Sequence, residues 1–67
     1  MLKIRYGKHA RFRMVERGIS DKEIRTAIIK GTKRIQNGKI VSSYLYFEVV
    51  YKKIKDEIYV ITVKPRW

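Results

Sequence analysis

The sequence contains no cysteine and a single histidine. Without cysteine the chain can form neither a disulfide bond nor a zinc site built on thiolates. One histidine and six scattered acidic residues give little basis for any other metal centre. We therefore expect no metal and no cofactor, and we expect the fold to depend on packing or on a partner.

Long apolar runs are also missing. No segment approaches the ~20 apolar residues that span a bilayer, and residues 1–6 alternate instead of forming the apolar core of a signal peptide. These absences predict a cytoplasmic protein with no membrane partner. With 67 residues the chain is one domain, 1–67, near the lower size limit for a hydrophobic core. A homodimer is compatible with so small a domain.

Acidic residues are scarce compared with basic ones. The chain has 17 Lys and Arg residues against six Asp and Glu residues, which gives a formal charge of +11. A thermophilic surface is also rich in lysine, but it balances both signs in ion-pair networks, which this composition does not. Such an excess repels itself and attracts polyanions over a Debye length of ~8–10 Å. Nucleic acid is therefore the leading class of partner.

Hydrophobic periodicity predicts an α+β fold whose first half is a short strand and two helices. Residues 2–6 alternate as a strand does, and residues 8–17 have the spacing of a helix that ends where Gly18 can adopt the left-handed conformation. Residues 20–23, Ser-Asp-Lys-Glu, form a capping box that begins a second helix, and Gly31 ends it.

The second half of the chain has the period-two pattern of a three- to four-stranded antiparallel sheet, packed on the helices. Asn37-Gly38 is a strong signal for a two-residue hairpin turn. A bend at Ser42-Ser43 is an alternative reading of that stretch. The predicted strands cover residues 33–36, 39–42, 44–53 and 57–64.

The connection at residues 54–56 decides which side chains of the last hairpin face the core. A three-residue loop pairs Lys53 with Glu57 and makes one face almost wholly apolar, whereas a two-residue loop brings Lys64 and Thr62 into it. Burial therefore favours the three-residue loop. The apolar face then carries Leu45, Phe47, Val49, Tyr51, Tyr59, Ile61 and Val63, and the opposite face carries Tyr44, Tyr46, Glu48, Val50, Lys52, Ile58, Val60, Thr62 and Lys64.

Basic and aromatic side chains are interleaved on that opposite face and at the end of the chain. Single-stranded RNA is bound by this combination, because cations hold its phosphates while tyrosine rings stack on its bases. The same tyrosines would equally serve hydrophobic packing or a dimer contact. The predicted RNA-binding residues are Tyr44, Tyr46, Lys52, Lys64 and Arg66.

The first predicted helix carries a basic stripe beside an apolar one, because residues four apart are neighbours on a helix. Ala10 and Met14 form the apolar stripe, which we expect to face the core. The basic stripe is then free to meet phosphate. The stripe consists of His9, Arg13 and Arg17, and Glu16 lies beside it. These four are the predicted catalytic residues.

Metal-independent RNA cleavage needs a base for the ribose 2'-hydroxyl and cations for the crowded phosphate. His9 can accept a proton near neutral pH, and Arg13 and Arg17 can stabilise the phosphate. Glu16 is an alternative base, or it orients Arg13 in a bidentate pair. The structural alternative is that His9 caps the helix and Glu16 ties it to the sheet.

Residues 9–20 resemble the signature His-Ala-x-x-Arg-Met-x-x-Arg-Gly-Ile of a family of small uncharacterised domains that is grouped with the RelE/ParE-like toxins. The second helix with its closing glycine and the strand at 59–63 extend the resemblance over nearly the whole chain. It implies a strand, two helices and an antiparallel sheet. Five residues match the signature, and their roles are not established in that family. They are His9, Arg13, Met14, Arg17 and Gly18.

The resemblance also implies a function. RelE-like toxins cut messenger RNA without a metal, often on the ribosome, and are silenced by an acidic antitoxin protein, whereas ParE-like toxins inhibit gyrase, so the fold alone does not determine the target. RelE-like catalytic residues lie mostly on the sheet and the C-terminal segment. We expect a toxin-like RNA-binding protein that acts as a messenger RNA endoribonuclease; the alternative is a non-catalytic basic module that binds RNA or protein.

Overall fold

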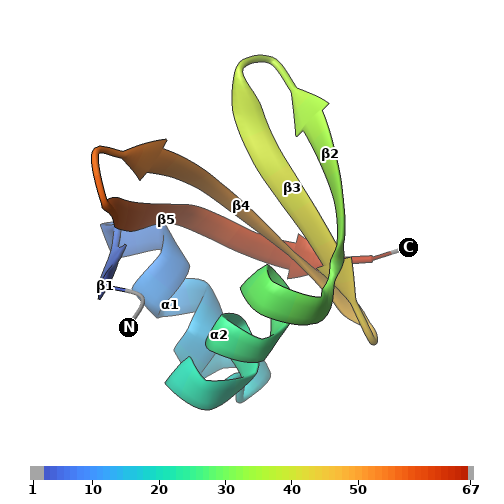
Figure 1. Cartoon of the computed structure of the whole chain (residues 1–67). Coiled ribbons are helices and arrows are strands. Elements are labelled where there is room, and N and C mark those ends of the chain that lie inside the picture. The colour runs from blue at the N-terminus through green and yellow to red at the C-terminus, as the bar shows by residue number, and fades with distance from the viewer. Residues whose placement is uncertain (1–2, 67) are drawn as a thin grey trace.

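The computed structural model describes residues 3–66 as one sheet with two helices packed against it (Figure 1). The elements follow each other in the predicted order of strand, helix, helix and strands. They are β1 (Lys3–Tyr6), α1 (Lys8–Arg17), α2 (Asp21–Lys30), β2 (Thr32–Gln36), β3 (Lys39–Tyr44), β4 (Phe47–Ile54) and β5 (Glu57–Pro65). Residue 2, which the sequence assigns to the first strand, lies outside the described residues.

The sheet has the strand order β1-β5-β4-β3-β2. β1 pairs with β5 in parallel, and the other neighbours are antiparallel. The predicted α+β class is therefore confirmed. The four strands β2–β5 form the predicted antiparallel sheet, and the N-terminal strand β1 adds in parallel to the free edge of β5, so the whole is a five-stranded mixed sheet.

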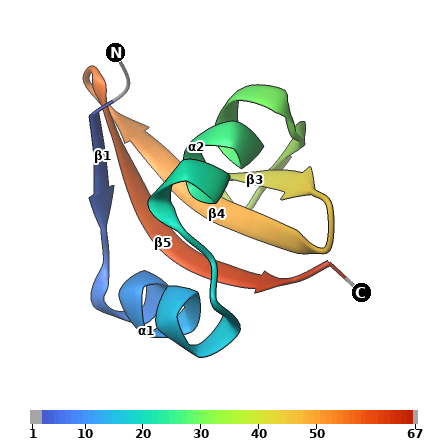
Figure 2. The same ribbon diagram turned by 90° about the horizontal axis from the view of Figure 1, so that it is seen from below.

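Both helices lie on the same face of the sheet. In the view from below, α1 lies beside β5, while α2 lies over β3 and β4 (Figure 2). Within residues 3–66, neither helix has the length and apolar composition needed to cross a membrane. No helix or strand of the described residues covers the opposite face of the sheet, which we call the open face.

Local signals end and begin the helices as predicted. Gly18 adopts the left-handed conformation, with φ of 67°, and Ile19 N–H donates to the Met14 carbonyl at 2.9 Å in the same turn. This closes α1 without the penalty that a side chain would add at positive φ. At the start of α2, Glu23 N–H donates to Ser20 Oγ at 3.2 Å and Ser20 N–H donates to Glu23 Oε1 at 3.0 Å, so the predicted capping box is confirmed.

The core lies between the helices and the sheet. α1 contributes little to it, since Ala10 is its one fully buried residue, with Met14 partly buried beside it as the predicted apolar stripe requires. α2 presents three buried side chains, which its 3.6-residue period places on one stripe. The buried cluster consists of Ala10, Ile19, Ile24, Ala27, Ile28, Phe47, Val49, Tyr51, Ile58, Val60 and Val63.

The β4–β5 hairpin has a two-residue turn, so the predicted three-residue loop is wrong. Ile54 pairs with Glu57, and Lys55 lies in the turn with φ of 58°. The hairpin still has one apolar face, because the pairing register of β4 and β5 shifts once, between Val50 and Tyr51. Such a bulge inserts one extra residue in the partner strand and returns the following side chains to the other face.

This bulge corrects the predicted faces of β5. Val49 and Tyr51 are two positions apart on β4, whereas their partners Val63 and Val60 are three positions apart on β5. β5 therefore has one extra residue here, Ile61. Ile58, Val60 and Val63 are buried under the helices, whereas Tyr59 is 38% exposed. Assigning Tyr59 and Ile61 to the core, and Ile58 and Val60 to the opposite face, is therefore wrong.

The chain reverses between β3 and β4 at a second unpredicted position. Tyr44 pairs with Phe47, and Leu45 lies in the turn between them, exposed and with φ of 53°. The predicted strand over 44–53 is therefore divided, and β3 continues straight through Ser42 and Ser43 without the alternative bend. The Asn37-Gly38 hairpin is confirmed, with positive φ at both turn residues.

Gly31 joins α2 to β2 where the two elements touch most closely. Its backbone is extended, so left-handed freedom is not the reason for glycine here. A Cβ at this position would lie 2.3 Å from Ser42 Oγ, 2.4 Å from the Ala27 carbonyl oxygen and 2.8 Å from the Ser43 carbonyl oxygen. Ser42 Oγ itself donates to the Ala27 carbonyl at 2.5 Å, which holds α2 on β3.

We expect Gly31→Ala to lower the free energy of unfolding by ~1–3 kcal/mol, because two of the three atoms in the way are backbone and cannot rotate aside. Urea denaturation followed by circular dichroism measures the change. Lys30→Ala, at the neighbouring exposed position, is the control and should alter stability by less than ~0.5 kcal/mol. Equal stability of the two variants would contradict a tight junction.

Candidate nucleic-acid interface

The open face is made by alternate residues of strands whose other residues face the helices. Cross-strand pairing places Arg34, Val41, Val50 and Thr62 in one row, and Ser43, Glu48 and Lys64 in the next. Basic residues occur on every strand of this face. Its principal side chains are Arg5, Arg34, Lys39, Val41, Ser43, Glu48, Val50, Lys52, Tyr59, Thr62 and Lys64.

A buried carboxylate organises the centre of the open face. Glu48 is 6% exposed, and Arg34 donates to it through two nitrogens, with Nη1 at 3.0 Å from Oε2 and Nη2 at 3.2 Å from Oε1. Ser43 Oγ donates to Oε2 at 2.8 Å, and Lys64 Nζ lies 3.8 Å from Oε1. A carboxylate can accept this many donors without leaving any buried oxygen unpaired.

These contacts stabilise the ionised form of Glu48. Hydrogen bonds from Arg34 lower the pKa of the carboxyl most, burial opposes them, and the Ser43 hydrogen bond adds to the lowering. The same pair raises the pKa of the Arg34 guanidinium. One anion therefore holds two cations, Arg34 and Lys64, in defined positions and still leaves the site with a net positive charge.

A groove runs along the open face between two hairpins. It has a volume of about 240 Å³, and Lys39 of the β2–β3 hairpin and Lys64 of β5 stand on its two sides. Val41 and Val50, 1% and 8% exposed, form an apolar floor. The β2–β3 and β4–β5 hairpins diverge in Figure 1. The residues lining the groove are Gln36, Asn37, Lys39, Val41, Val50, Ile61, Thr62 and Lys64.

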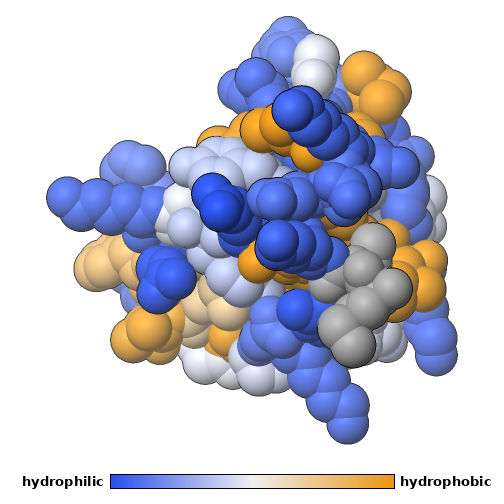
Figure 3. All heavy atoms as spheres, turned by 60° about the vertical axis from the view of Figure 1, so that its left-hand side comes forward, coloured by the Kyte–Doolittle hydropathy of each residue, from blue (hydrophilic) through white to orange (hydrophobic). Residues whose placement is uncertain are grey.

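Further cations surround an aromatic ring at the β1 end of the face. Tyr59 is flanked by Arg5 on β1 and Lys52 on β4, its two cross-strand partners. Glu57 pairs with Arg5, at 3.1 Å from Nε, and with Lys3, at 3.6 Å from Nζ. Seen from the side of β1 and the β4–β5 turn, hydrophilic side chains cover most of the surface (Figure 3).

The five predicted RNA-binding residues do not share one face, which corrects that part of the prediction. Lys52 and Lys64 lie on the open face, toward opposite ends of the β4–β5 hairpin. Tyr44 instead packs on the helix side, edge-on to the buried Phe47 with 6.3 Å between ring centroids. The physical reason is the Leu45-Tyr46 turn, which puts Tyr44 opposite Phe47 on the core face.

Tyr46 and Arg66 form a second, separate group at the β3–β4 turn. Tyr46 is 44% exposed and packs edge-on to Phe47 with 5.3 Å between ring centroids. Arg66 Nη1 donates to the Leu45 carbonyl at 3.0 Å, and Arg66 N–H donates to the Tyr46 carbonyl at 3.1 Å. Arg66 therefore holds this turn in place.

The predicted catalytic residues lie together on the exposed side of α1. His9, Arg13, Arg17 and Glu16 are all exposed. Arg13 Nη1 pairs with Glu16 Oε1 at 3.3 Å, a single i,i+3 contact in place of the predicted bidentate pair. None of the four lines the groove on the open face. Among residues 3–66, no group of three or more His, Asp or Glu side chains could hold a metal ion.

The sequence interpretation missed the central cluster. Arg34 and Ser43 are separated from Glu48 by 14 and 5 positions, and only strand pairing brings them together. One signal was present: Glu48 is the single charged residue in the run Phe47-Glu-Val-Val-Tyr51. A carboxylate on an apolar strand needs a cationic partner, since an unpaired buried charge is very costly.

The fold and the open face define a small α+β domain with a basic groove on its sheet. Residues 6–64 match the model of the family described as a domain of unknown function, DUF4258, and the chain belongs to this family. Membership of a family of small uncharacterised domains is thus confirmed, but the match shows no link to RelE/ParE-like toxins. No curated protein and no solved structure gives a significant match to the chain.

The lowered pKa of Glu48 predicts an acid-sensitive contribution to stability. A depressed folded-state pKa stabilises the fold at pH values above the unfolded value, here about 4.5, and that contribution is lost as the pH falls through the folded-state value. Wild type should therefore melt at a higher temperature than Glu48→Gln at pH 7, and the difference should shrink below about pH 4.5. Glu16→Gln, at an exposed position, is the control and should show a much smaller difference at pH 7.

Proposed function

We propose that this protein binds single-stranded RNA on the open face of its sheet. The observation that carries the proposal is the groove of about 240 Å³, in which Lys39 and Lys64 flank an apolar floor of Val41 and Val50. Phosphates fit the cationic sides, and a base fits the apolar floor. The formal charge of +11 supplies long-range attraction for a polyanion.

The Glu48 cluster supports the same proposal. A cation that is already held in place loses little conformational entropy when it binds a ligand. Glu48 holds Arg34 through two hydrogen bonds while about half of the Arg34 side chain stays exposed. A planar guanidinium of this kind stacks on a base or pairs with a phosphate. Tyr59, between Arg5 and Lys52, offers a second stacking surface.

A more specific version of this proposal is the toxin-like activity that the resemblance implies. Such a protein would cut messenger RNA in the cytoplasm and would be neutralised by an acidic protein. Metal-independent cleavage by the α1 stripe is supported by the exposure of His9 next to Arg13, which Glu16 orients. Binding without cleavage is the alternative that the experiments below distinguish.

The groove predicts the effect of two lysines on RNA binding. Lys39→Ala combined with Lys64→Ala should weaken binding of a fluorescein-labelled single-stranded RNA, measured by fluorescence anisotropy, and should do so for all sequences. Because each lost phosphate contact in single-stranded RNA lowers the salt slope by ~0.7, the slope of log affinity against log salt should fall by ~1.4.

The matched control removes two lysines from the helical side. Lys22→Ala combined with Lys30→Ala makes the same change in net charge at exposed positions of α2. If this control weakens RNA binding as much as the groove variant, attraction is non-specific and the open face is not the binding site. Single-stranded DNA of the same sequence, used as a competitor, tests the preference for RNA.

The α1 stripe predicts the outcome of an expression test. Induced wild-type protein should arrest bacterial growth and deplete intact messenger RNA, and His9→Ala with Arg13→Ala should abolish both effects while leaving the melting temperature nearly unchanged, because both side chains are exposed. No arrest by folded wild type, or equal arrest by the double variant, would rule out cleavage by this stripe.

A further inference from the structure

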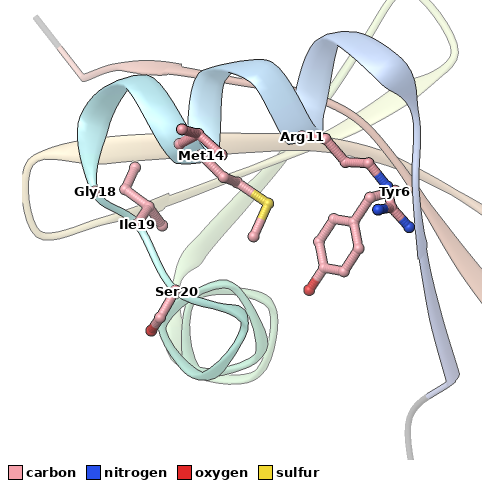
Figure 4. Close-up of a pocket in the computed structure, with 7 residues that line it drawn as sticks. Tyr6, Arg11, Met14, Gly18, Ile19 and Ser20 are labelled. Carbon is pink, nitrogen blue, oxygen red and sulfur yellow. The ribbon is translucent and has the colours of Figure 1, made fainter.

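A second hollow in the structure lies between the two helices, away from the open face. It has a volume of about 640 Å³. Figure 4 shows the Met14 side chain extending from α1 into this space, with Tyr6 on one side and the start of α2 below. The lining is mainly apolar, and the residues that form it are Tyr6, Arg11, Met14, Val15, Gly18, Ile19 and Ser20.

The helix above this hollow leaves two large apolar side chains exposed. Val15, which lines the hollow, is 83% exposed, and Phe12, one turn before it on α1, is 64% exposed. The helix buries only Ala10 completely. An apolar concavity next to exposed large side chains is typical of a surface that meets a partner.

The polar groups around the hollow determine the charge of that partner. Two carboxylates bond to residues that line the hollow. Tyr6 OH donates to Asp21 Oδ1, and Arg25 Nε pairs with Asp21 Oδ2 at 2.7 Å, while Ser20 N–H donates to Glu23 Oε1 at 3.0 Å in the capping box. The hydrogen bonds from Tyr6 and Arg25 also lower the pKa of Asp21. Arg11 lines the hollow and makes no ion pair with any residue of the described range 3–66. The charge it offers is therefore positive.

We infer that the hollow between α1 and α2 binds an acidic amphipathic helix of another protein. The apolar stripe of such a helix fits the concavity over Met14, Val15 and Ile19, and its carboxylates meet Arg11 and the other cations of α1. A second copy of this chain would bring its own charge of +11 to the same surface. A bilayer surface is flat and cannot fill a hollow, whereas a protruding row of side chains can.

This inference rests on the proposed function in one respect, since it gives a binding surface to the acidic protein named there. It uses different residues from the RNA site, so RNA binding can fail or succeed independently of it. The probe is a labelled helical peptide of about 15 residues with leucines at i, i+3, i+4 and i+7 and glutamates on the flanks. We expect it to bind wild-type protein, measured by fluorescence anisotropy, and to shift the amide resonances of Val15 and Ile19. A polyglutamate peptide without leucines should bind at least about tenfold more weakly.

Two matched variants separate the hollow from general attraction to a basic protein. Val15→Lys and Ile35→Lys each add one positive charge at an exposed apolar position, on α1 and on β2. Val15→Lys should weaken peptide binding by about tenfold or more, and Ile35→Lys should leave it unchanged or slightly stronger. Arg11→Glu should also weaken it, whereas Lys55→Glu in the β4–β5 turn should have a smaller effect. RNA binding by Val15→Lys should equal that of wild type.

Four outcomes would overturn the inference. They are equal peptide affinity of Val15→Lys and Ile35→Lys; binding of polyglutamate as tight as that of the amphipathic peptide; a wild-type dimer in sedimentation that Val15→Lys dissociates; and tighter binding of anionic phosphatidylserine vesicles than of the peptide, lost in Val15→Lys. The third outcome would assign the hollow to a second copy, and the fourth would assign it to a membrane surface.

Discussion

The pairing of β4 with β5 is the constraint on which the rest of the structure depends. β5 accepts β1 on its other edge and supports α1, while β4 accepts β3. The bulge at Val50 and Tyr51 lets a tight two-residue turn coexist with an apolar helix face. Without this extra residue the half of β5 beyond it would present Thr62 and Lys64 to the helices, and the core would lose Val63.

The same bulge shapes the two sides of the sheet differently. On the helix side it keeps Val60 and Val63 in one buried surface. On the open side it places Ile61 and Thr62 next to each other along the groove. Packing demands on one face thus help to form the candidate binding site on the other, since strong local twist accompanies a bulge.

Charge is the second constraint on this small domain. Among the described residues, Glu48 and Glu57 pair with cations from other strands, whereas Asp21 and Glu16 pair with arginines of their own helices. The pair with Arg34 matters most at Glu48, since that carboxylate would otherwise be buried alone. Of the cations outside these pairs, Lys39 lines the groove on the sheet and Arg11 lines the hollow between the helices, the two surfaces that we propose for RNA and for a protein helix.

Features that depend on neighbours in the chain were predictable from sequence. The capping box at Ser20, the left-handed Gly18 and the Asn37-Gly38 turn all act within a few residues, and all three are present. The exposed stripe of His9 and Arg13 also follows from helical spacing. The turn at Leu45 was not predictable in the same way, because neither Leu45 nor Tyr46 is a residue that favours positive φ.

The sequence by itself determined the α+β class, the boundaries of the helices and the excess of positive charge, because local hydrogen bonds and composition suffice for these. Only the tertiary structure decided the register of the last hairpin, the opposite faces on which Tyr44 and Tyr59 lie, and the ion pair between Arg34 and Glu48. These features depend on contacts between distant residues and on burial shared by several strands. A single bulge changes that burial more than any local preference does.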